Sequence, residues 1–351
     1  MIVFPSPMSD AAMARPGARP GANGDTTTIS HDDASTTLCV VVPAYNEQEV
    51  LHALHARVSA VLRALPFRWQ VLYVNDGSRD STGTMLLQLA EQDPHVAVLE
   101  LSRNFGKEIA LSAGLDHAET DLVIVIDADL QDPPELIPQL IDGWRQGYDV
   151  VYAQRLTRAG ESWFKRATAS AFYRLVGRVS HVKIPRDTGD FRLLTRRAVL
   201  AVRQLREQHR FMKGIFTWVG FPQLAVPYHR DARQAGTTKW NYWKLWNFAL
   251  EGITSFSTAP LKLATYGGLA SALFSFAYGI YMVIDTLLFG NRVPGYPSLM
   301  TVMLFLGGLQ LMAIGVVGEY VGRMFDEVKG RPLYLLKTCR VSPAPATTAP
   351  R

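Results

Sequence analysis

The sequence predicts an α/β domain with a mostly parallel sheet, followed by interfacial helices and two helices that span a membrane. Three observations predict this architecture. Short apolar runs alternate with helical patterns between residues 37 and 200, two long segments near the C-terminus carry no charge, and tryptophans mixed with lysines precede the first of these segments. Apolar strands that alternate with helices are typical of parallel sheets covered on both faces.

Five short apolar runs are the predicted strands. They are Leu38–Val42, Trp69–Val74, Val96–Leu101, Leu122–Ile126 and Asp149–Ala153. The polar segments PAYNE, NDGS, SRNFGKE and DADLQD directly follow the first four runs. Because ligands bind at the carboxyl ends of parallel strands, these segments predict a single ligand site at one edge of the sheet. No G-x-G-x-x-G or Walker A loop is present, which argues against a dinucleotide-binding or P-loop protein.

Composition divides the chain into six predicted parts. They are a disordered tail over 1–36, the α/β domain over 37–232, a loop with amphipathic interfacial helices over 233–262, spans over 263–285 and 298–320, and a basic cytoplasmic tail over 321–351. The net charge of +5 fits an anionic partner or basic membrane flanks. Cys39 and Cys339 lie far apart in different kinds of segment, which argues against a disulfide framework and fits a reducing compartment.

The two uncharged segments each have about the length of a helix that crosses a bilayer. Basic residues such as Lys262 and Arg323 lie outside the pair, whereas the loop between the segments holds one arginine. The positive-inside rule therefore places both termini and the α/β domain in the cytoplasm. Trp240, Trp243 and Trp246 lie three residues apart, which predicts a helix face in the headgroup layer. A pair of buried core helices is the alternative.

A cluster of acids follows the fourth predicted strand. Asp132 and Glu135 flank the start of a helical pattern, where they are expected to cap the helix. Asp127, Asp129 and Gln131 have no such explanation, and in an extended segment residues two apart share one face. Their oxygen atoms suit Mg²⁺ or Mn²⁺, and the usual partner of such an ion is a phosphate.

The motifs VVPAYNE, VNDGS, SRNFGKE and DADLQDPPE, in this order, resemble those of glycosyltransferase family 2 enzymes of the Rossmann-like GT-A fold. The chain is most similar to polyprenyl-phosphate glycosyltransferases, a group with dolichyl-phosphate mannose synthases and bacterial undecaprenyl-phosphate glucosyltransferases. The resemblance covers residues 37 to 337 and includes the GEYVGR run that begins at Gly318. It implies a nucleotide-sugar donor, a polyprenyl phosphate acceptor, a divalent metal, and a homo-oligomer such as a tetramer.

The resemblance also implies roles for individual residues on the donor side. The nucleotide is expected to contact Pro43, Tyr45, Glu47, Asp76 and Asp127. Asp127, Asp129 and Gln131 are expected to hold the metal, and Asp129 is thereby a catalytic candidate. Arg233 and Lys239 lie in RQAGTTKW, which is similar to the family's loop that closes over the diphosphate; Trp240 stands where many relatives have tyrosine. Tyr45 packed on the sheet, and Arg233 and Lys239 as membrane anchors, are the structural alternatives.

On the acceptor side, the stretch DTGDF resembles a family motif and makes Asp190 the second catalytic candidate. Arg155, Arg166 and Ser170 match the pattern that grips the acceptor phosphate. The alternatives are that Asp190 caps a turn and that the arginines form a solvated or headgroup-facing patch.

The predicted function is inverting transfer of a hexose to undecaprenyl phosphate at the cytoplasmic face of the bacterial inner membrane, with UDP-glucose favoured as the donor. GDP-mannose, UDP-N-acetylhexosamines and UDP-4-amino-arabinose derivatives remain open as donors. A processive polysaccharide synthase would need more spans and a Q-x-x-R-W motif, and the sequence shows neither. A pyrophosphorylase would need a glycine-rich loop after the first strand, where this sequence has PAYNE. A non-catalytic membrane scaffold is a further alternative, against which the acids Asp127, Asp129 and Asp190 argue. No nucleic-acid partner is expected.

Overall fold

The computed structural model describes residues 35–156, 188–228, 259–289 and 295–340. Its strands are β1 (Thr37–Ala44), β2 (Arg68–Asn75), β3 (Val96–Leu101), β4 (Leu122–Val125), β5 (Val150–Arg155), β6 (Thr188–Thr195), β7 (Gln223–Tyr228) and β8 (Leu336–Arg340). Its helices are α1 (Leu51–Arg63), α2 (Thr82–Gln92), α3 (Lys107–His117), the 3₁₀ turn η1 (Pro134–Leu136), α4 (Ile137–Arg145), α6 (Arg196–Gln204), α7 (Met212–Trp218), α9 (Ala259–Phe289) and α10 (Tyr296–Val328).

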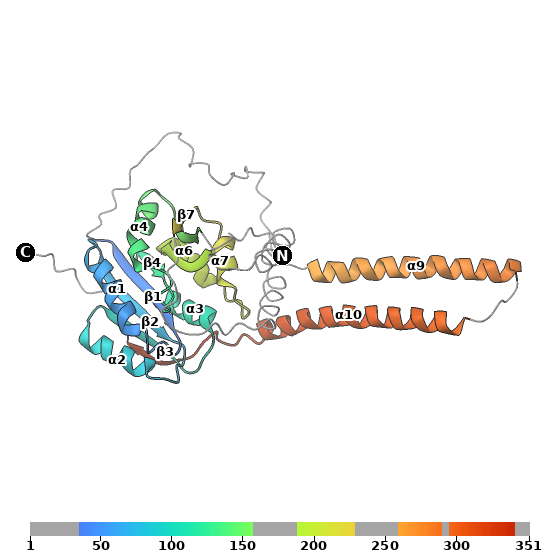
Figure 1. Cartoon of the computed structure of the whole chain (residues 1–351), viewed down its shortest axis with the longest axis horizontal. Helices are drawn as coiled ribbons and strands as arrows, with labels where there is room; N and C mark the ends of the chain where they lie inside the picture. The colour runs from blue at the N-terminus through green and yellow to red at the C-terminus, as the bar shows by residue number, and fades with distance from the viewer. Residues whose placement is uncertain (1–34, 157–187, 229–258, 290–294, 341–351) are drawn as a thin grey trace, which may run out of the picture. The chain divides into compact units, whose positions relative to one another are not determined.

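The described strands form one mixed sheet in the order β7-β5-β6-β4-β1-β2-β3-β8 (Figure 1). The central strands β4, β1, β2 and β3 are parallel, and β7 is parallel to β5. Strand β6 runs antiparallel between β4 and β5, and β8 runs antiparallel beside β3. The predicted α/β class is therefore confirmed, and the five apolar runs match β1 to β5 within two residues at each end.

Helices cover both faces of the sheet because successive side chains of its central strands point to opposite sides. Leu38, Val40 and Val42 pack in one hydrophobic core with α1, α2 and α4. Cys39 and Val41 pack in a second core with α3, α6 and α7. Burial on both faces explains why these strands are apolar without interruption.

Helix α3 lies unusually close to the sheet. A Cβ atom added at Gly114 would be 2.2 Å from Cγ1 of Val41 on β1 and 3.1 Å from Cγ2 of Val74 on β2. Only glycine leaves room for this approach. Helix α3 begins at Lys107 and contacts β1, β2 and β3.

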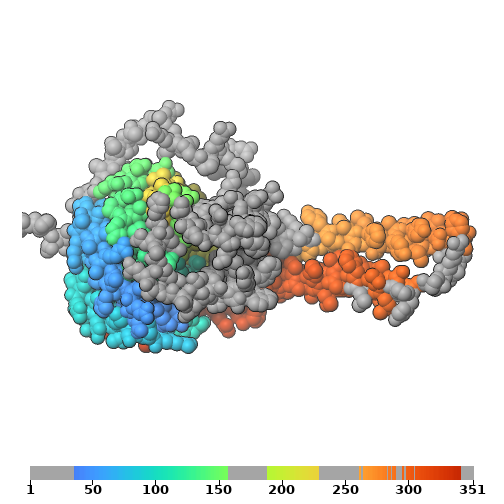
Figure 2. Space-filling model, in the orientation of Figure 1, coloured from blue at the N-terminus to red at the C-terminus, as the bar shows by residue number. Residues whose placement is uncertain are grey.

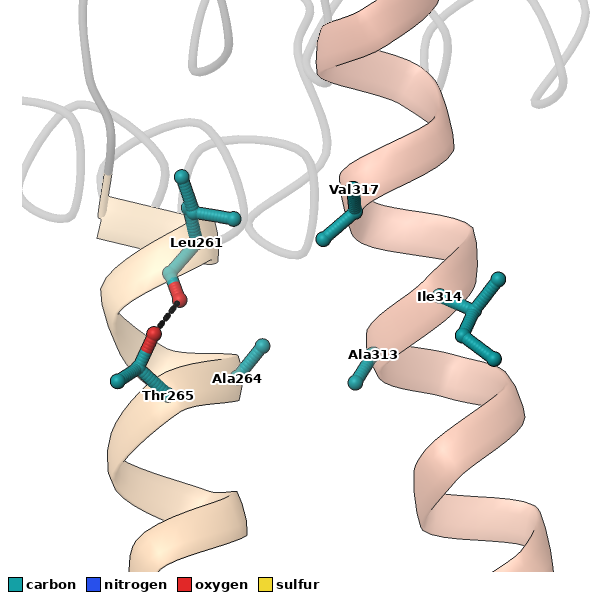
Figure 3. Close-up of a pocket in the computed structure, with 6 residues that line it drawn as sticks. All are labelled: Leu261, Ala264, Thr265, Ala313, Ile314 and Val317. Carbon is teal, nitrogen blue, oxygen red and sulfur yellow. Dashed lines mark hydrogen bonds between the residues drawn. The ribbon is translucent and has the colours of Figure 1, made fainter.

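Two helices are long and apolar enough to cross a membrane. They are Ala264–Phe289 within α9 and Ser298–Val328 within α10, and none of the most apolar part of either is buried. Figure 2 shows one face of the two helices. The helices pack on each other, with a shallow apolar recess between them that is lined by Leu261, Ala264, Thr265, Ala313, Ile314 and Val317 (Figure 3). The predicted spans 263–285 and 298–320 lie within these helices.

The chain returns to the sheet after α10. Strand β8 pairs with β3, and the N–H of Ser102 donates to the carbonyl oxygen of Leu335 at 2.9 Å. The hydroxyl of Tyr334 donates to Oδ2 of Asp116 on α3 at 3.0 Å. Part of the segment predicted as a basic tail, 321–351, is thus the end of α10 and an edge strand of the sheet. Periodicity did not reveal β8, because its residues LKTCR are mostly exposed and not apolar.

Candidate functional site

The loops that follow β1 and β2 are joined at the carboxyl edge of the sheet. The N–H of Asn46 donates to Oγ of Ser78 at 3.1 Å, and the N–H of Arg79 donates to Oδ1 of Asn46 at 2.9 Å. The N–H of Glu47 donates to Oγ1 of Thr82 at 2.9 Å. Pro43 lies buried near the end of β1, and Tyr45 is 39% exposed and belongs to neither core.

Asp76 ties the third loop to the first two. Its buried carboxylate accepts the N–H groups of Phe105 at 2.7 Å and Gly106 at 2.9 Å, and its own N–H donates to the carbonyl oxygen of Ala44. Burial raises the pKa of Asp76, and these two N–H donors oppose that effect. At Gly77, with φ +62°, an added Cβ would lie 2.4 Å from the carbonyl carbon of Arg103, so the loops approach too closely for any side chain.

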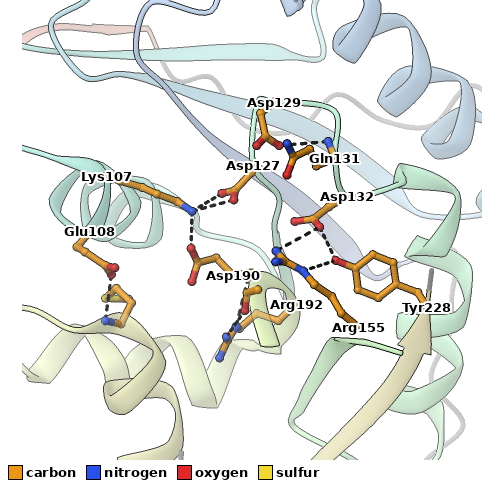
Figure 4. Close-up of polar contacts among 12 residues, drawn as sticks. Lys107, Glu108, Asp127, Asp129, Gln131, Asp132, Arg155, Asp190, Arg192 and Tyr228 are labelled. Carbon is orange, nitrogen blue, oxygen red and sulfur yellow. Dashed lines mark hydrogen bonds and ion pairs between the residues drawn. The ribbon is translucent and has the colours of Figure 1, made fainter. Parts of the chain in front are cut away.

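The loop after β4 does not have the extended geometry that the sequence predicts. Strand β4 ends at Val125, and Leu130 has a positive φ of 58°. The rule that residues two apart share a face therefore does not apply. The N–H of Gln131 donates to Oδ1 of Asp129 at 3.1 Å, so these two residues lie side by side, whereas Asp127 points to Lys107 (Figure 4).

The predicted helix caps are wrong. The helical turn begins at Pro134, and no side chain caps it. Pro133 precedes a second proline, which disfavours helical geometry, and it has an extended ψ of 120°. The chain therefore turns away from Asp132, and Glu135 instead accepts two hydrogen bonds from the guanidinium of Arg57, at 3.0 and 2.8 Å.

Asp132 belongs to a buried network with Tyr228 and Arg155. Its carboxylate is fully buried and accepts a hydrogen bond from the hydroxyl of Tyr228 at the end of β7. That hydroxyl accepts a hydrogen bond at 3.2 Å from Nε of Arg155, at the end of β5, and a terminal nitrogen of Arg155 lies 4.0 Å from Oδ1 of Asp132 (Figure 4). Tyr228 and Asp132 therefore hold the guanidinium of Arg155 in place, which argues against the alternative of a solvated patch for this residue.

An ion-pair network connects β6 to the loop after β4, here called the acid loop because it carries Asp127 and Asp129. The ammonium of Lys107 lies 2.7 Å from Oδ1 and 2.8 Å from Oδ2 of Asp127, and it also pairs with Oδ2 of Asp190 (Figure 4). Burial opposes ionisation of Lys107, but the two carboxylates outweigh it and raise its pKa. Burial also raises the pKa of Asp127, against the effect of Lys107.

Asp190 lies inside β6 and is 5% exposed, so it does not cap a turn. Its Oδ1 atom is buried and accepts no hydrogen bond from the described residues. Burial alone would raise the pKa of Asp190, but Lys107, Lys213 and Arg192 outweigh it, and the pKa lies well below the usual range. A lowered pKa favours the anionic form of Asp190 over the protonated form.

Of the cations around Asp190, Arg192 is buried, whereas Lys213 is only partly buried. Arg192 donates to the carbonyl oxygens of Asp190 and Gly189 at 3.2 and 2.9 Å and lies over the ring of Phe216. Burial lowers the pKa of Arg192 to about 10 and lowers the pKa of Lys213. Glu108 accepts the N–H of Met212 at 3.0 Å, and burial, with Asp190 nearby, raises its pKa to about 7.

Four of these charged residues were not predicted as site residues: Lys107, Glu108, Arg192 and Lys213. Lys107 and Glu108 end the motif SRNFGKE, so their place after a predicted strand was an available signal. Arg192 and Lys213 carry no comparable signal, because β6 is antiparallel and α7 is short. Four predicted site residues lie outside the described residues: Arg166, Ser170, Arg233 and Lys239. Most of the predicted tail over 1–36 and most of the predicted interfacial segment over 233–262 also lie outside them.

The matches to known families agree with this architecture. The profile of the family described as glycosyl transferase family 2 matches residues 39–202, and that of the GtrB C-terminal hairpin matches residues 259–324. An uncharacterized glycosyltransferase of Synechocystis is 54% identical over 299 residues, which are 85% of this chain and 94% of that protein. The chain belongs to glycosyl transferase family 2, as its motifs predict.

Two further relatives have more specific names. A prophage-derived bactoprenol glucosyl transferase of Shigella flexneri is 51% identical over 300 residues, which are 86% of this chain and 97% of the relative. A prophage bactoprenol glucosyl transferase homolog of Escherichia coli K12 is 49% identical over 300 residues, which are 86% of this chain and 98% of the relative. The similarity thus extends through the α/β domain and the helical hairpin together.

Proposed function

We propose that this protein is an inverting glycosyltransferase that transfers glucose from UDP-glucose to undecaprenyl phosphate at the cytoplasmic face of a bacterial inner membrane. The observation that carries the proposal is the identity of about half of the aligned residues to a bactoprenol glucosyl transferase and to a homolog of one, over nearly the whole length of each relative. The charged site at the carboxyl edge of the sheet supports it, because a diphosphate donor and a phosphate acceptor both need cations.

The residues of the acid loop fit a divalent metal. Asp127, Asp129 and Gln131 offer only oxygen ligands, which Mg²⁺ and Mn²⁺ prefer. The largely buried carboxylate of Asp127 already binds a cation, the ammonium of Lys107. When bound, the metal would neutralise charge that grows on the departing diphosphate.

The remaining chemistry belongs to the chain. A phosphate monoester is ionised near pH 7, so its oxygen is a nucleophile without a strong base. In the proposal, Arg155 orients this phosphate from its anchored position, and Asp190 orients the acceptor as an anion. An acceptor oxygen forms the new bond to the anomeric carbon, the bond to the diphosphate breaks, and its electron pair leaves with UDP. Attack opposite the leaving group inverts the anomeric centre. Pro43, Tyr45, Glu47 and Asp76 are proposed to surround the nucleotide.

The arrangement in the membrane is part of the same proposal. Helices α9 and α10 have the length and apolar composition of two spans. Basic residues such as Lys262 and Arg323 lie before the first span and after the second, and the positive-inside rule places these two flanks in the cytoplasm. A catalytic domain on the cytoplasmic side meets both the sugar nucleotide and the lipid phosphate. A homo-oligomer, with a tetramer as one form, is proposed from the family resemblance and is testable by light scattering in detergent.

The direct test is a transfer assay with the full chain in detergent. Undecaprenyl phosphate would be combined with labelled UDP-glucose, GDP-mannose, UDP-N-acetylglucosamine or a UDP-4-amino-arabinose derivative, with Mg²⁺, with Mn²⁺ or with EDTA. We expect a glucosyl lipid from UDP-glucose that EDTA abolishes. A lipid product from another sugar only would refute the donor, and no lipid product from any donor would refute the acceptor.

A single substitution tests the metal assignment. Asp129→Asn should remove nearly all transfer while the protein stays folded and bound to membranes, because an amide replaces a charged ligand. Asp142→Asn is the matched control, since Asp142 is an exposed residue of α4 that pairs with Arg145 at 3.1 Å. Transfer by Asp129→Asn at the rate of the control would exclude Asp129 as a metal ligand.

A further inference from the structure

Lys107 forms ion pairs with two carboxylates at once. Its ammonium lies between carboxylates from two different parts of the fold, Asp127 in the loop after β4 and Asp190 in β6 (Figure 4). The carboxylates are largely buried, with side chains 17% and 7% exposed, whereas the Lys107 side chain is 45% exposed. The lysine therefore reaches from the surface into the gap between two acids.

We propose that the ammonium of Lys107 occupies the position at Asp127 that a divalent ion would take. The ion must displace the ammonium in order to bind, so metal binds weakly alone and strongly together with a nucleoside diphosphate. The identity of the diphosphate as that of a sugar nucleotide rests on the proposed function. The competition between lysine and metal does not, because it follows from the ion pairs of Lys107 with Asp127 and Asp190.

The two carboxylates depend on Lys107 to different degrees. Asp190 also faces the positive charges of Lys213 and Arg192. Asp127 has no second cation within ion-pair distance in the described part of the chain. A metal ion at Asp127 would lie next to the ammonium and would be repelled by it, so binding requires Lys107 to move away from Asp127.

Lys107 has a place to remain when it leaves Asp127. An ammonium has three donors, and the pair with Asp190 uses one of them. The Oδ1 atom of Asp190 is buried and accepts no hydrogen bond from any described residue, so the carboxylate has capacity for a further donor. The donors freed from Asp127 can then bind an anion held beside the metal. A diphosphate supplies that anion, which removes the repulsion and makes metal and nucleotide bind cooperatively.

The test measures Mn²⁺ binding by electron paramagnetic resonance, with the full chain in detergent and without any transfer reaction. We expect Lys107→Met to bind Mn²⁺ alone about tenfold more tightly than wild type, which corresponds to about 1.4 kcal/mol. Lys107→Arg keeps the charge and should bind as weakly as wild type. Lys213→Met is the matched control, because it also removes a positive charge facing Asp190 but no ion pair with Asp127, and its affinity should change less than about threefold.

UDP tests the second half of the proposal. Adding UDP should strengthen Mn²⁺ binding to wild type by a larger factor than to Lys107→Met, because only wild type regains a partner for the displaced ammonium. Equal factors for the two proteins would refute the cooperative binding of metal and diphosphate. An unchanged or weaker Mn²⁺ affinity of Lys107→Met would refute the competition between Lys107 and metal. Lys107→Gln provides a second neutral variant should Lys107→Met fail to fold, as judged by near-ultraviolet circular dichroism. Failure of glucosyl transfer with these binding results intact would refute the proposed function alone.

Discussion

The hydroxyl of Tyr228 offers a sharp test of how the site is held. Replacing it by Tyr228→Phe keeps a ring of nearly the same size in its buried position but removes one oxygen atom. That oxygen donates to Asp132 and accepts from Nε of Arg155. The change therefore removes one hydrogen bond from the fully buried carboxylate of Asp132 and one from Arg155, the residue proposed to bind the acceptor phosphate.

The magnitude follows from the charges involved. Hydrogen bonds to charged groups contribute roughly 1.5–3 kcal/mol each, and a buried group that loses its partner is penalised further. Asp132 keeps Arg155 at 4.0 Å, which offsets part of the loss. We expect a net destabilisation of about 2 kcal/mol. For a domain of about 200 residues this lowers the Tm by about 4–8 °C.

Thermal unfolding and acceptor kinetics together are the assay. The Tm of Tyr228→Phe should fall by the stated amount, and the KM for polyprenyl phosphate should rise severalfold while the KM for the sugar nucleotide stays the same. Tyr152→Phe is the matched control, because the Tyr152 hydroxyl on β5 makes no hydrogen bond with the described residues. A Tm within about 1 °C of the control would refute the network, and a larger rise in donor KM than in acceptor KM would move Arg155 to the donor side.

Three further changes probe other parts of the structure. Glu108→Gln should become more stable relative to wild type as the pH rises from about 5 to about 8 in thermal scans. Burial raises the pKa of Glu108 from 4.5 to about 7, so between these values Glu108 ionises in the unfolded protein before it does in the folded one, which favours unfolding of wild type. A constant difference in Tm would contradict this. Gly114→Ala should destabilise the protein by about 1–3 kcal/mol in denaturant titrations through its clash with Val41, whereas Gly267→Ala in α9, where an added Cβ meets no described atom within 4 Å, should not. Deleting residues 331–351 should lower the Tm and the transfer rate while the hairpin stays in the membrane, because β8 is lost; normal transfer by this truncated protein would show that β8 is dispensable.

The sequence was sufficient for the parts of the fold that are buried and periodic. Strands β1 to β5 were predicted because burial on both faces of the sheet leaves uninterrupted apolar runs. The four polar loops could be assigned to one edge because parallel strands end together. Family resemblance added a function that periodicity does not contain.

The details of the site depended on geometry that no pattern expresses. Asp132 fitted a helix cap by spacing, but the following pair of prolines moves the helix start, and Tyr228 from a strand about a hundred residues away takes its carboxylate. Lys107 reaches Asp190 across 83 residues of sequence. Strand β8 lacks an apolar run because it covers an edge and has exposed faces. Each of these contacts is long-range and polar, and such contacts leave no local signal.

The position of β8 has a consequence for biosynthesis. Strand β3 precedes both long helices in the chain, whereas its partner β8 follows them, so the ribosome makes β3 well before β8. Until then the outer edge of β3 has no strand beside it, and an unpaired edge invites aggregation. A nascent chain must therefore deliver its hairpin before its sheet can be closed. Chains that stop before residue 336 would leave an α/β domain with an open edge for chaperones and proteases to recognise, so the order of elements along the chain couples completion of the sheet to synthesis of the helical hairpin.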